Sequence, residues 1–296
     1  MLTVLLGLAG AVTYGFADFL GGLAAKRIPA VLVTAVTAAV GLVPILVGLL
    51  VVESAFSRDA VLFGVLGGLS GTLGVVLLYG ALAVGPMSVL SPITAVVSAI
   101  LPVVVGVFRG IALSPVGVGA VVLAIVAVVL VAAVDDHSGA RISVRGLLTA
   151  LCSGAAFGGL VLAFAATPAD SGAAPLLVAR TVQVVVMGAI VLVGATLTRR
   201  VPSRAGGRGP ARWWTRGLVW TLVACGCCDA AANVFIQAGL HSSSDPSVLP
   251  VMSVLNALYP IGTIVLATFV LRERLGAVQV LGMALALIAS VGLALS

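Results

Sequence analysis

Charged residues are scarce in this chain, since Asp, Glu, Lys and Arg together make up 8% of its 296 residues. A soluble domain carries roughly a quarter charged residues, so this chain lacks the charge needed to cover a surface in water. Apolar residues supply 61% of the sequence, and the mean hydropathy is +1.31. The composition predicts an all-α integral membrane protein, because helices satisfy their own backbone hydrogen bonds in lipid.

Motifs of catalysis and of metal binding are missing as well. The sequence contains no P-loop, H-E-x-x-H or G-x-S-x-G motif, and its two histidines, His137 and His241, lie in separate predicted loops. Three of the four cysteines form the run Cys225-Gly226-Cys227-Cys228, which includes a C-x-x-C spacing. The run lies inside an apolar segment with no histidine beside it, so we interpret it as small thiols packed between helices. We predict no enzyme activity, no metal, no cofactor and no ATP-driven pumping.

The basic residues are concentrated in one stretch of the chain. The net charge is +6, and residues 199–216, RRVPSRAGGRGPARWWTR, hold a large share of the arginines. A stretch this rich in Arg, Gly and Pro cannot pack a core. We expect it to form a loop that touches anionic lipid headgroups, with Trp213 and Trp214 at the interface. We expect no nucleic-acid partner.

Apolar segments of about 20 residues, the length that spans a bilayer, alternate with short polar breaks along the chain. The predicted helices cover residues 2–25, 30–52, 59–82, 87–108, 112–134, 146–167, 174–198, 217–240, 246–270 and 275–295. The polar link 135–145 separates five helices in residues 1–134 from five in residues 146–296. Because five is odd, two such units enter the bilayer in opposite directions. The sequence therefore predicts ten transmembrane helices in two inverted five-helix repeats.

Two pairs of prolines support this repeat. Pro92 and Pro102 are ten residues apart, as are Pro250 and Pro260, and the pairs superpose at an offset of 158 residues. We expect these prolines to kink the fourth and ninth helices. A kink frees backbone carbonyls at membrane depth, which is tolerated where they face protein or a wet cavity.

The distribution of Lys and Arg predicts the orientation. Loops after odd-numbered helices hold twelve basic residues, whereas loops after even-numbered helices hold two, Arg58 and Arg109. Short basic loops stay in the cytoplasm. We therefore expect a multi-pass protein of the cell inner (plasma) membrane, with loop 199–216 cytoplasmic and both termini outside.

The region around the ninth helix carries a recurring pattern of residues, which comprises Leu258-Tyr259-Pro260, Thr263, Glu273-Arg274-Leu275, Gln279 and Gly282. Tyr14 to Arg27 in the first helix and Ala179-Arg180 in the seventh accompany it. Together these positions resemble the EamA family of the drug/metabolite transporter superfamily. The first half departs from this pattern, because Gly110-Ile111-Ala112 replaces the Glu-Arg link and Thr34 stands at the counterpart of Arg180. The family's termini are usually cytoplasmic, and here we follow the arginines instead.

This resemblance implies a ten-helix carrier that moves small metabolites, amino acids or drugs without hydrolysing ATP. We predict a secondary-active transporter that works by alternating access, with export as the expected direction. The alternative is a non-transporting multi-pass receptor or assembly subunit. A single copy with ten helices can enclose a transport pathway, so the expected state is a monomer or a homodimer.

Three charged residues lie within predicted membrane helices: Asp18, Arg180 and Asp229. Each costs about 2.5–3.5 kcal/mol at the bilayer centre on insertion scales, so such residues are functional candidates. The two aspartates are candidate proton carriers, and Arg180 is a candidate clamp for a substrate carboxylate. The other interpretation of Arg180 is a structural ion pair with Asp18 or Asp229.

Polar residues at helical spacing extend these positions into stripes. The predicted substrate and coupling cavity comprises Tyr14, Asp18, Tyr79, Arg180, Gln183, Asp229, Asn233, Gln237, Asn256, Tyr259 and Thr263. Helix-to-helix hydrogen bonding is the alternative role of Asn233, Gln237 and Asn256. We interpret Glu273 and Arg274 as a link-forming ion pair or helix cap at the membrane edge.

Overall fold

The structure, a computed structural model, describes residues 2–108, 115–133, 143–199, 214–240, 242, 259–272 and 276–294. Over these residues the chain forms α-helices and one short 3-10 helix, and no strand. The helices are α1 (Leu2–Ala25), α2 (Ala30–Val51), α3 (Arg58–Val84), α4 (Met87–Phe108), α5 (Pro115–Ala133), α6 (Val144–Ala165), η1 (Ala169–Ser171), α7 (Ala174–Arg199), α8 (Arg216–Leu240), α10 (Tyr259–Val270) and α11 (Ala277–Ala294).

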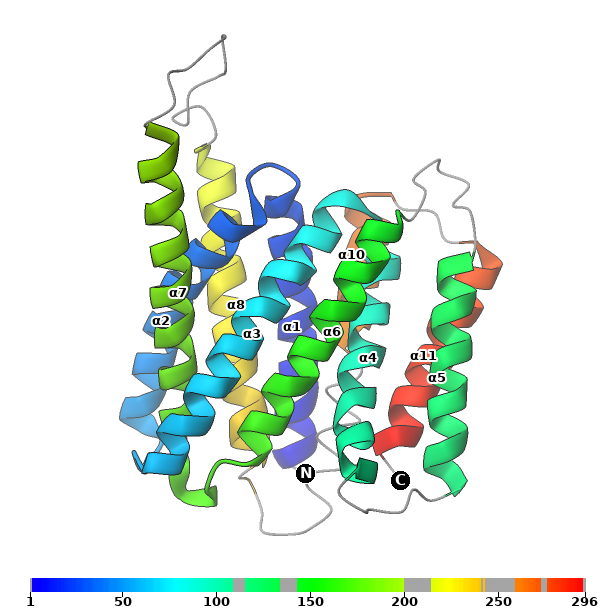
Figure 1. The fold of residues 1–296 in the computed structure, drawn as a ribbon, viewed down its shortest axis with the longest axis horizontal. Helices are drawn as coiled ribbons and strands as arrows, with labels where there is room; N and C mark the ends of the chain where they lie inside the picture. Colours follow the sequence, from blue (N-terminus) through cyan, green and yellow to red (C-terminus); the bar gives the residue numbers. More distant parts are fainter. Residues whose placement is uncertain are drawn as a thin grey trace.

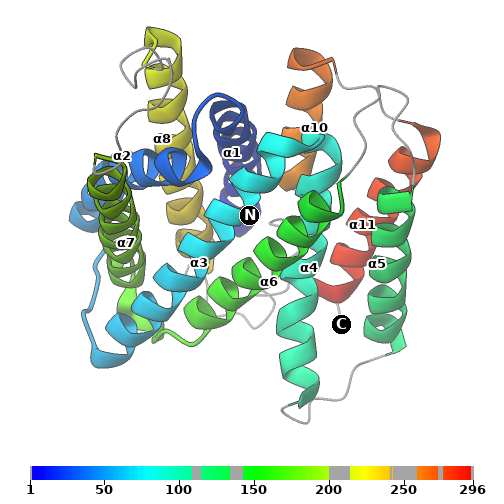
Figure 2. The ribbon, with the colours of Figure 1, turned by 45° about the horizontal axis from the view of Figure 1, so that its top comes forward.

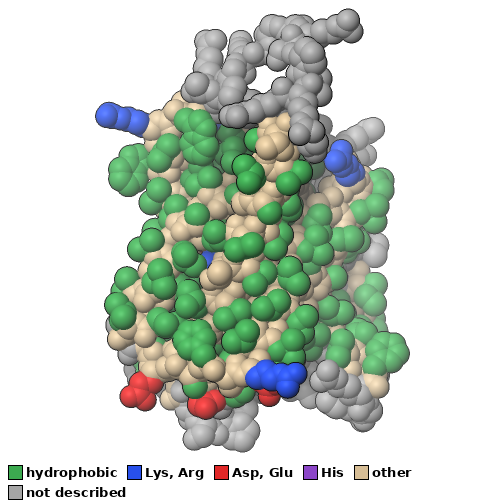
Figure 3. Space-filling model, turned by 60° about the vertical axis from the view of Figure 1, so that its left-hand side comes forward, with side chains coloured by type: hydrophobic (Ala, Val, Ile, Leu, Met, Phe, Trp, Pro, Cys, Tyr) green, Lys and Arg blue, Asp and Glu red, His purple; other side chains and the backbone are tan. Residues whose placement is uncertain are grey.

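Six of the described helices are long and apolar enough to cross a membrane: α1, α2, α3, α6, α7 and α8. Large apolar side chains on the helices face outward, such as Leu50 at 87% exposed and Trp220 at 70%. Figure 3 shows apolar side chains over the height of one face, with most charged side chains near its two ends. An apolar belt between charged ends fits lipid tails and not water. The protein is therefore a helical, membrane-embedded protein.

The helices form a bundle in which segments far apart in sequence lie side by side (Figures 1 and 2). Helix α1 packs along α8, and α3 packs along α6. Helices α5 and α11 pair with each other at one edge, beside α4. The buried side chains Val96, Ala127 and Ala289 join these three helices.

Glycines set the close approach of several helix pairs. A Cβ added to Gly68 in α3 would lie 2.7 Å from the carbonyl oxygen of Ala179 in α7. A Cβ added to Gly226 in α8 would likewise lie 2.6 Å from the carbonyl oxygen of Thr37 in α2. Small residues allow such backbone contact where no hydrophobic force drives helices together.

The connections α2–α3 and α6–α7 are joined at one end of the bundle. The backbone N–H of Ala173 donates to Ser54 Oγ at 2.9 Å, and that of Ala55 donates to the carbonyl of Asp170 at 3.2 Å. Gly172 adopts φ +52°, and a Cβ there would lie 2.7 Å from Ser54 Oγ. Glycine suits this turn for both its backbone conformation and its lack of a side chain.

Helices α2, α3 and α6 have both ends among the described residues, and they begin and end within two residues of the predicted ranges. Of the predicted range 246–270, only α10 is described. Helix α4 continues through both Pro92 and Pro102. Pro260 is the second described residue of α10, and the residues before Tyr259 lie outside the described part of the chain. Some predicted features lie outside the described residues: Pro250, Asn256, Glu273, Arg274, most of the link 135–145 and most of the loop 199–216.

Candidate functional site

A cavity of about 120 Å³ lies inside the helical bundle, with walls from α1, α2, α3, α4, α6, α7, α8 and α10. It collects all three charged residues that the sequence places at membrane depth, Asp18, Arg180 and Asp229. It also collects every tyrosine of the chain, Tyr14, Tyr79 and Tyr259. Gln183 and Asn233 complete the predicted residues that line it.

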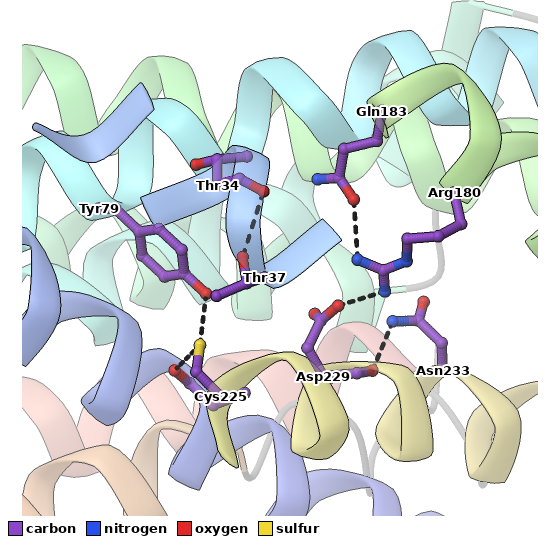
Figure 4. A network of polar contacts seen from close by, with 9 residues as sticks. Thr34, Thr37, Tyr79, Arg180, Gln183, Cys225, Asp229 and Asn233 are labelled. Carbon is purple, nitrogen blue, oxygen red and sulfur yellow. Dashed lines mark hydrogen bonds and ion pairs between the residues drawn. The ribbon is translucent and has the colours of Figure 1, made fainter. Parts of the chain in front are cut away.

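Arg180 forms an ion pair with Asp229 across the α7–α8 boundary (Figure 4). Its Nη1 donates to Gln183 Oε1 at 2.8 Å, one turn along α7. Asn233 Nδ2 donates to the backbone carbonyl of Asp229 at 2.7 Å, one turn along α8. The side chains of Arg180 and Asp229 are 7% and 17% exposed. Helical spacing therefore builds a connected polar wall from two helices, as i, i+3 and i, i+4 neighbours share a face.

Asp18 lies on the α1 side of the same cavity and is 9% exposed. Among the described residues, none forms a hydrogen bond or ion pair with its carboxyl group. Its neighbours are aromatic: Tyr14 precedes it by one turn, and the Tyr14 and Tyr259 rings lie 6.3 Å apart, inclined at 60°. The Tyr79 ring lies over Gly21, where a Cβ would come within 2.1 Å of the ring. The residues around Asp18 are thus tyrosines and not basic side chains.

Tyr79, which lines the cavity, contacts α8 at the thiol of Cys225. Its hydroxyl lies 3.2 Å from Cys225 Sγ, and the Cys225 thiol donates to the carbonyl of Ala17 at 3.3 Å (Figure 4). The tyrosine hydroxyl is therefore the donor to sulfur. Cys227, two residues on, is exposed. Cys225 therefore forms hydrogen bonds to both α1 and α3, a role that the sequence analysis did not assign to it.

Two predicted cavity residues make contacts elsewhere. Gln237 Nε2 donates to the carbonyl of Gly172 at 3.1 Å, at the end where the α6–α7 connection lies. Thr263 is buried and donates to the carbonyl of Gly15 at 3.1 Å, which ties α10 to α1. Neither residue is among those that line the cavity. Asn256, the remaining predicted residue, lies outside the described part of the chain.

The sequence analysis missed the opposite, apolar wall of the cavity. Helix α3 contributes backbone through Gly67, Gly68 and Gly71, and α6 contributes Phe157 and Leu160, among others. A Cβ at Gly67 would lie 2.9 Å from a ring carbon of Phe164, so these glycines make room for bulky α6 side chains. The spacing of the α3 glycines along one face was the available signal.

Comparison with known proteins supports the fold alone. No family model and no curated protein matches the chain. A solved crystal structure, described only as "Crystal structure of protein", is similar to it with a TM-score of 0.59 and 16% sequence identity. The match covers 98% of this chain and 95% of the other. The two chains therefore share an arrangement of helices over nearly their whole lengths.

Proposed function

We propose that this protein is a secondary-active transporter of the EamA type, which carries a small solute through the cavity by alternating access. The observation that carries the proposal is that Asp18, Arg180 and Asp229 meet at one cavity between membrane-spanning helices. Ionisable groups at this depth are costly, and they mark pathways for substrates and ions in membrane proteins. A structural ion pair accounts for Arg180 and Asp229 in a scaffold, but it leaves Asp18 without a partner among the described residues.

The packing of the helices supports two inverted repeats, in which α1 to α5 correspond to α6, α7, α8, α10 and α11. Under this correspondence the α1–α8 contact becomes the α6–α3 contact, and both are extensive. Gly226 follows Gly68 by 158 residues, the offset of the paired prolines, and each lies against a backbone carbonyl of the other repeat.

A second set of equivalent contacts relates α1 to α6. A Cβ at Gly15 would lie 2.7 Å from the carbonyl oxygen of Tyr259, and one at Gly158 would lie 2.7 Å from Leu101 Cβ. Leu101 precedes Tyr259 by the same 158 residues. The pattern favours a cavity on the pseudo-two-fold axis, which is where transporters with inverted repeats bind their substrates.

Alternating access requires the two ends of the cavity to open in turn. At one end of the bundle, hydrogen bonds join Ala173 to Ser54 and Gln237 to Gly172. We expect these hydrogen bonds to break when the cavity opens at that end. Asp18 and Asp229 are the proposed proton carriers, because a carboxyl group in a membrane cavity can bind and release a proton as the two ends alternate. We further propose export, with loop 199–216 on the cytoplasmic side.

Flux measurements on reconstituted protein test the proposal. Proteoliposomes carrying an internal pH dye would receive amino acids, nucleosides, sugars and cationic drugs in turn. We expect one chemical class to move protons faster than in protein-free liposomes, with a smaller response from Asp18→Asn protein. If folded protein that binds a solute moves neither that solute nor protons, it is a receptor or assembly subunit, and the transport proposal is wrong.

A further inference from the structure

The cavity holds an unbalanced charge. Its charged side chains are Arg180, Asp229 and Asp18. Arg180 and Asp229 neutralise each other in their ion pair. With all three ionised, the cavity therefore carries one net negative charge, and that charge belongs to Asp18.

The burial of Asp18 makes this charge costly unless something pairs with it. The side chain is about nine-tenths buried, and no described residue offers it a hydrogen bond or a positive charge. A buried carboxylate without a partner is strongly disfavoured. Because the described protein supplies no partner, a ligand that enters the cavity can supply one.

The side chains around Asp18 suit a particular ligand chemistry. Tyr14 and Tyr259 lie close together beside it, and Tyr79 lies over the next turn of α1 at Gly21. Aromatic rings attract ammonium groups through their electron-rich faces. An acidic group among three tyrosines fits a cation with an apolar surface better than it fits a small metal ion.

An anion is less suited to this cavity. The Arg180 guanidinium is already engaged, through Nη1 with Gln183 and through Nη2 with Asp229. A carboxylate would have to share the guanidinium with Asp229, so it would meet the negative charges of both Asp229 and Asp18. A cation would leave the cavity neutral, because it balances Asp18 and leaves the ion pair intact.

We propose that the solute is a monovalent organic cation, a protonated amine or quaternary ammonium ion, held by the Asp18 carboxylate among Tyr14, Tyr79 and Tyr259. This inference rests on the proposed transport function for its physiological meaning, but binding itself can be measured without transport. Asp18 is then the residue that selects substrates by charge, and the Arg180–Asp229 pair lines the same cavity without contributing net charge.

Binding to purified protein in detergent tests the inference with probes matched in shape. Benzyltrimethylammonium, benzyl alcohol and benzoate share an aromatic ring and differ in charge, and tetramethylammonium serves as a smaller cation. We expect at least one cation to bind and to raise the melting temperature, with weaker or no binding of benzyl alcohol and benzoate. Asp18→Asn should weaken cation binding about thirtyfold or more, as expected when one partner of a buried charge pair is removed.

Asp59→Asn is the matched control, because it removes one negative charge at an exposed position in the first turn of α3. It should bind the cations as the unaltered protein does. Preference for benzoate or benzyl alcohol, no binding of either cation, or full binding by folded Asp18→Asn would each overturn the inference. If Asp18→Asn does not fold, the charge preference of the unaltered protein alone decides.

The outcomes separate this inference from the transport proposal. Cation binding that depends on Asp18, without flux in proteoliposomes, would support the ligand class and contradict transport. Flux of a neutral or anionic solute, without cation binding, would support transport and contradict the ligand class.

Discussion

The two halves that we propose to be inverted repeats place very different side chains at corresponding positions of one cavity. Asp229 and Asn233 of α8 line it, and so do Gly71 and Val75 of α3, which precede them by 158 residues. The α1–α8 and α3–α6 contacts are both extensive, yet one wall of the cavity is polar and the other apolar. In the proposed repeat arrangement, the common scaffold fixes where the cavity lies, and sequence divergence between the halves fixes the chemistry of each wall.

We expect the largest effect on stability from breaking the ion pair on the polar wall. Replacing Asp229 by Leu leaves Arg180 buried without its counter-charge, which should cost about 3–5 kcal/mol of stability. Arg180→Met alone should cost a similar amount. The double substitution should recover most of the loss, because apolar side chains can replace a buried pair. Thermal unfolding of the four proteins in detergent measures the coupling.

A substitution on the apolar wall serves as the control for the Arg180 and Asp229 substitutions. Val75→Ala, at the position equivalent to Asn233, removes no charge and should lower stability far less than either single change. If the double variant is no more stable than the two single variants predict additively, Arg180 and Asp229 are not an energetic pair.

The glycine contacts test the symmetric part of the comparison. Gly68→Ala and Gly226→Ala each place a Cβ about as close to a backbone carbonyl, at 2.7 and 2.6 Å. Each should therefore destabilise by a similar amount, about 1–3 kcal/mol, the usual cost of overpacking. Gly188→Ala should cost nothing measurable, since no atom lies within 4 Å of its Cβ. A large effect at only one of the two contacts would contradict equivalent packing.

The smallest expected effect lies at Tyr79, which corresponds to Gln237 at the offset of 158 residues. Tyr79→Phe removes the hydroxyl that donates to Cys225 and keeps the ring over Gly21. We expect a loss of about 0.5–1.5 kcal/mol, the net value of one hydrogen bond. Thiol labelling during partial unfolding would report it as earlier exposure of Cys225. Unchanged stability and labelling would mean that ring packing alone holds this contact.

Much of the helical architecture could be predicted from the sequence, because the length of an apolar run and its polar breaks fix where a membrane helix begins and ends. The predicted range 30–52 and the observed α2, Ala30–Val51, differ by one residue. Start signals were less visible: Ser143 caps α6 by accepting from the N–H of Gly146, and the predicted helix began later. A single side-chain cap is a weak signal beside a 20-residue apolar run.

The candidate site was predictable only in part. Eight of the eleven predicted residues line the cavity, because helical periodicity identifies the polar face of each helix. The glycine-lined α3 wall was not identified. A glycine that lines a cavity and a glycine that sits in a tight helix contact look the same in the sequence. Gln237 shares the stripe of Asp229 and Asn233, but it lies near the end of α8 and bonds to Gly172 instead.

The sequence by itself determined that the chain lies in a membrane and that Asp18, Arg180 and Asp229 lie at membrane depth. It left open which aspartate pairs with Arg180, because periodicity assigns a face to each helix and not the helix that this face meets. Only the tertiary structure decided this: α7 and α8 bring Arg180 to Asp229, while α1 turns Asp18 toward three tyrosines. Packing distances between helices, which no single segment encodes, determine which aspartate pairs with Arg180 and which has no partner among the described residues.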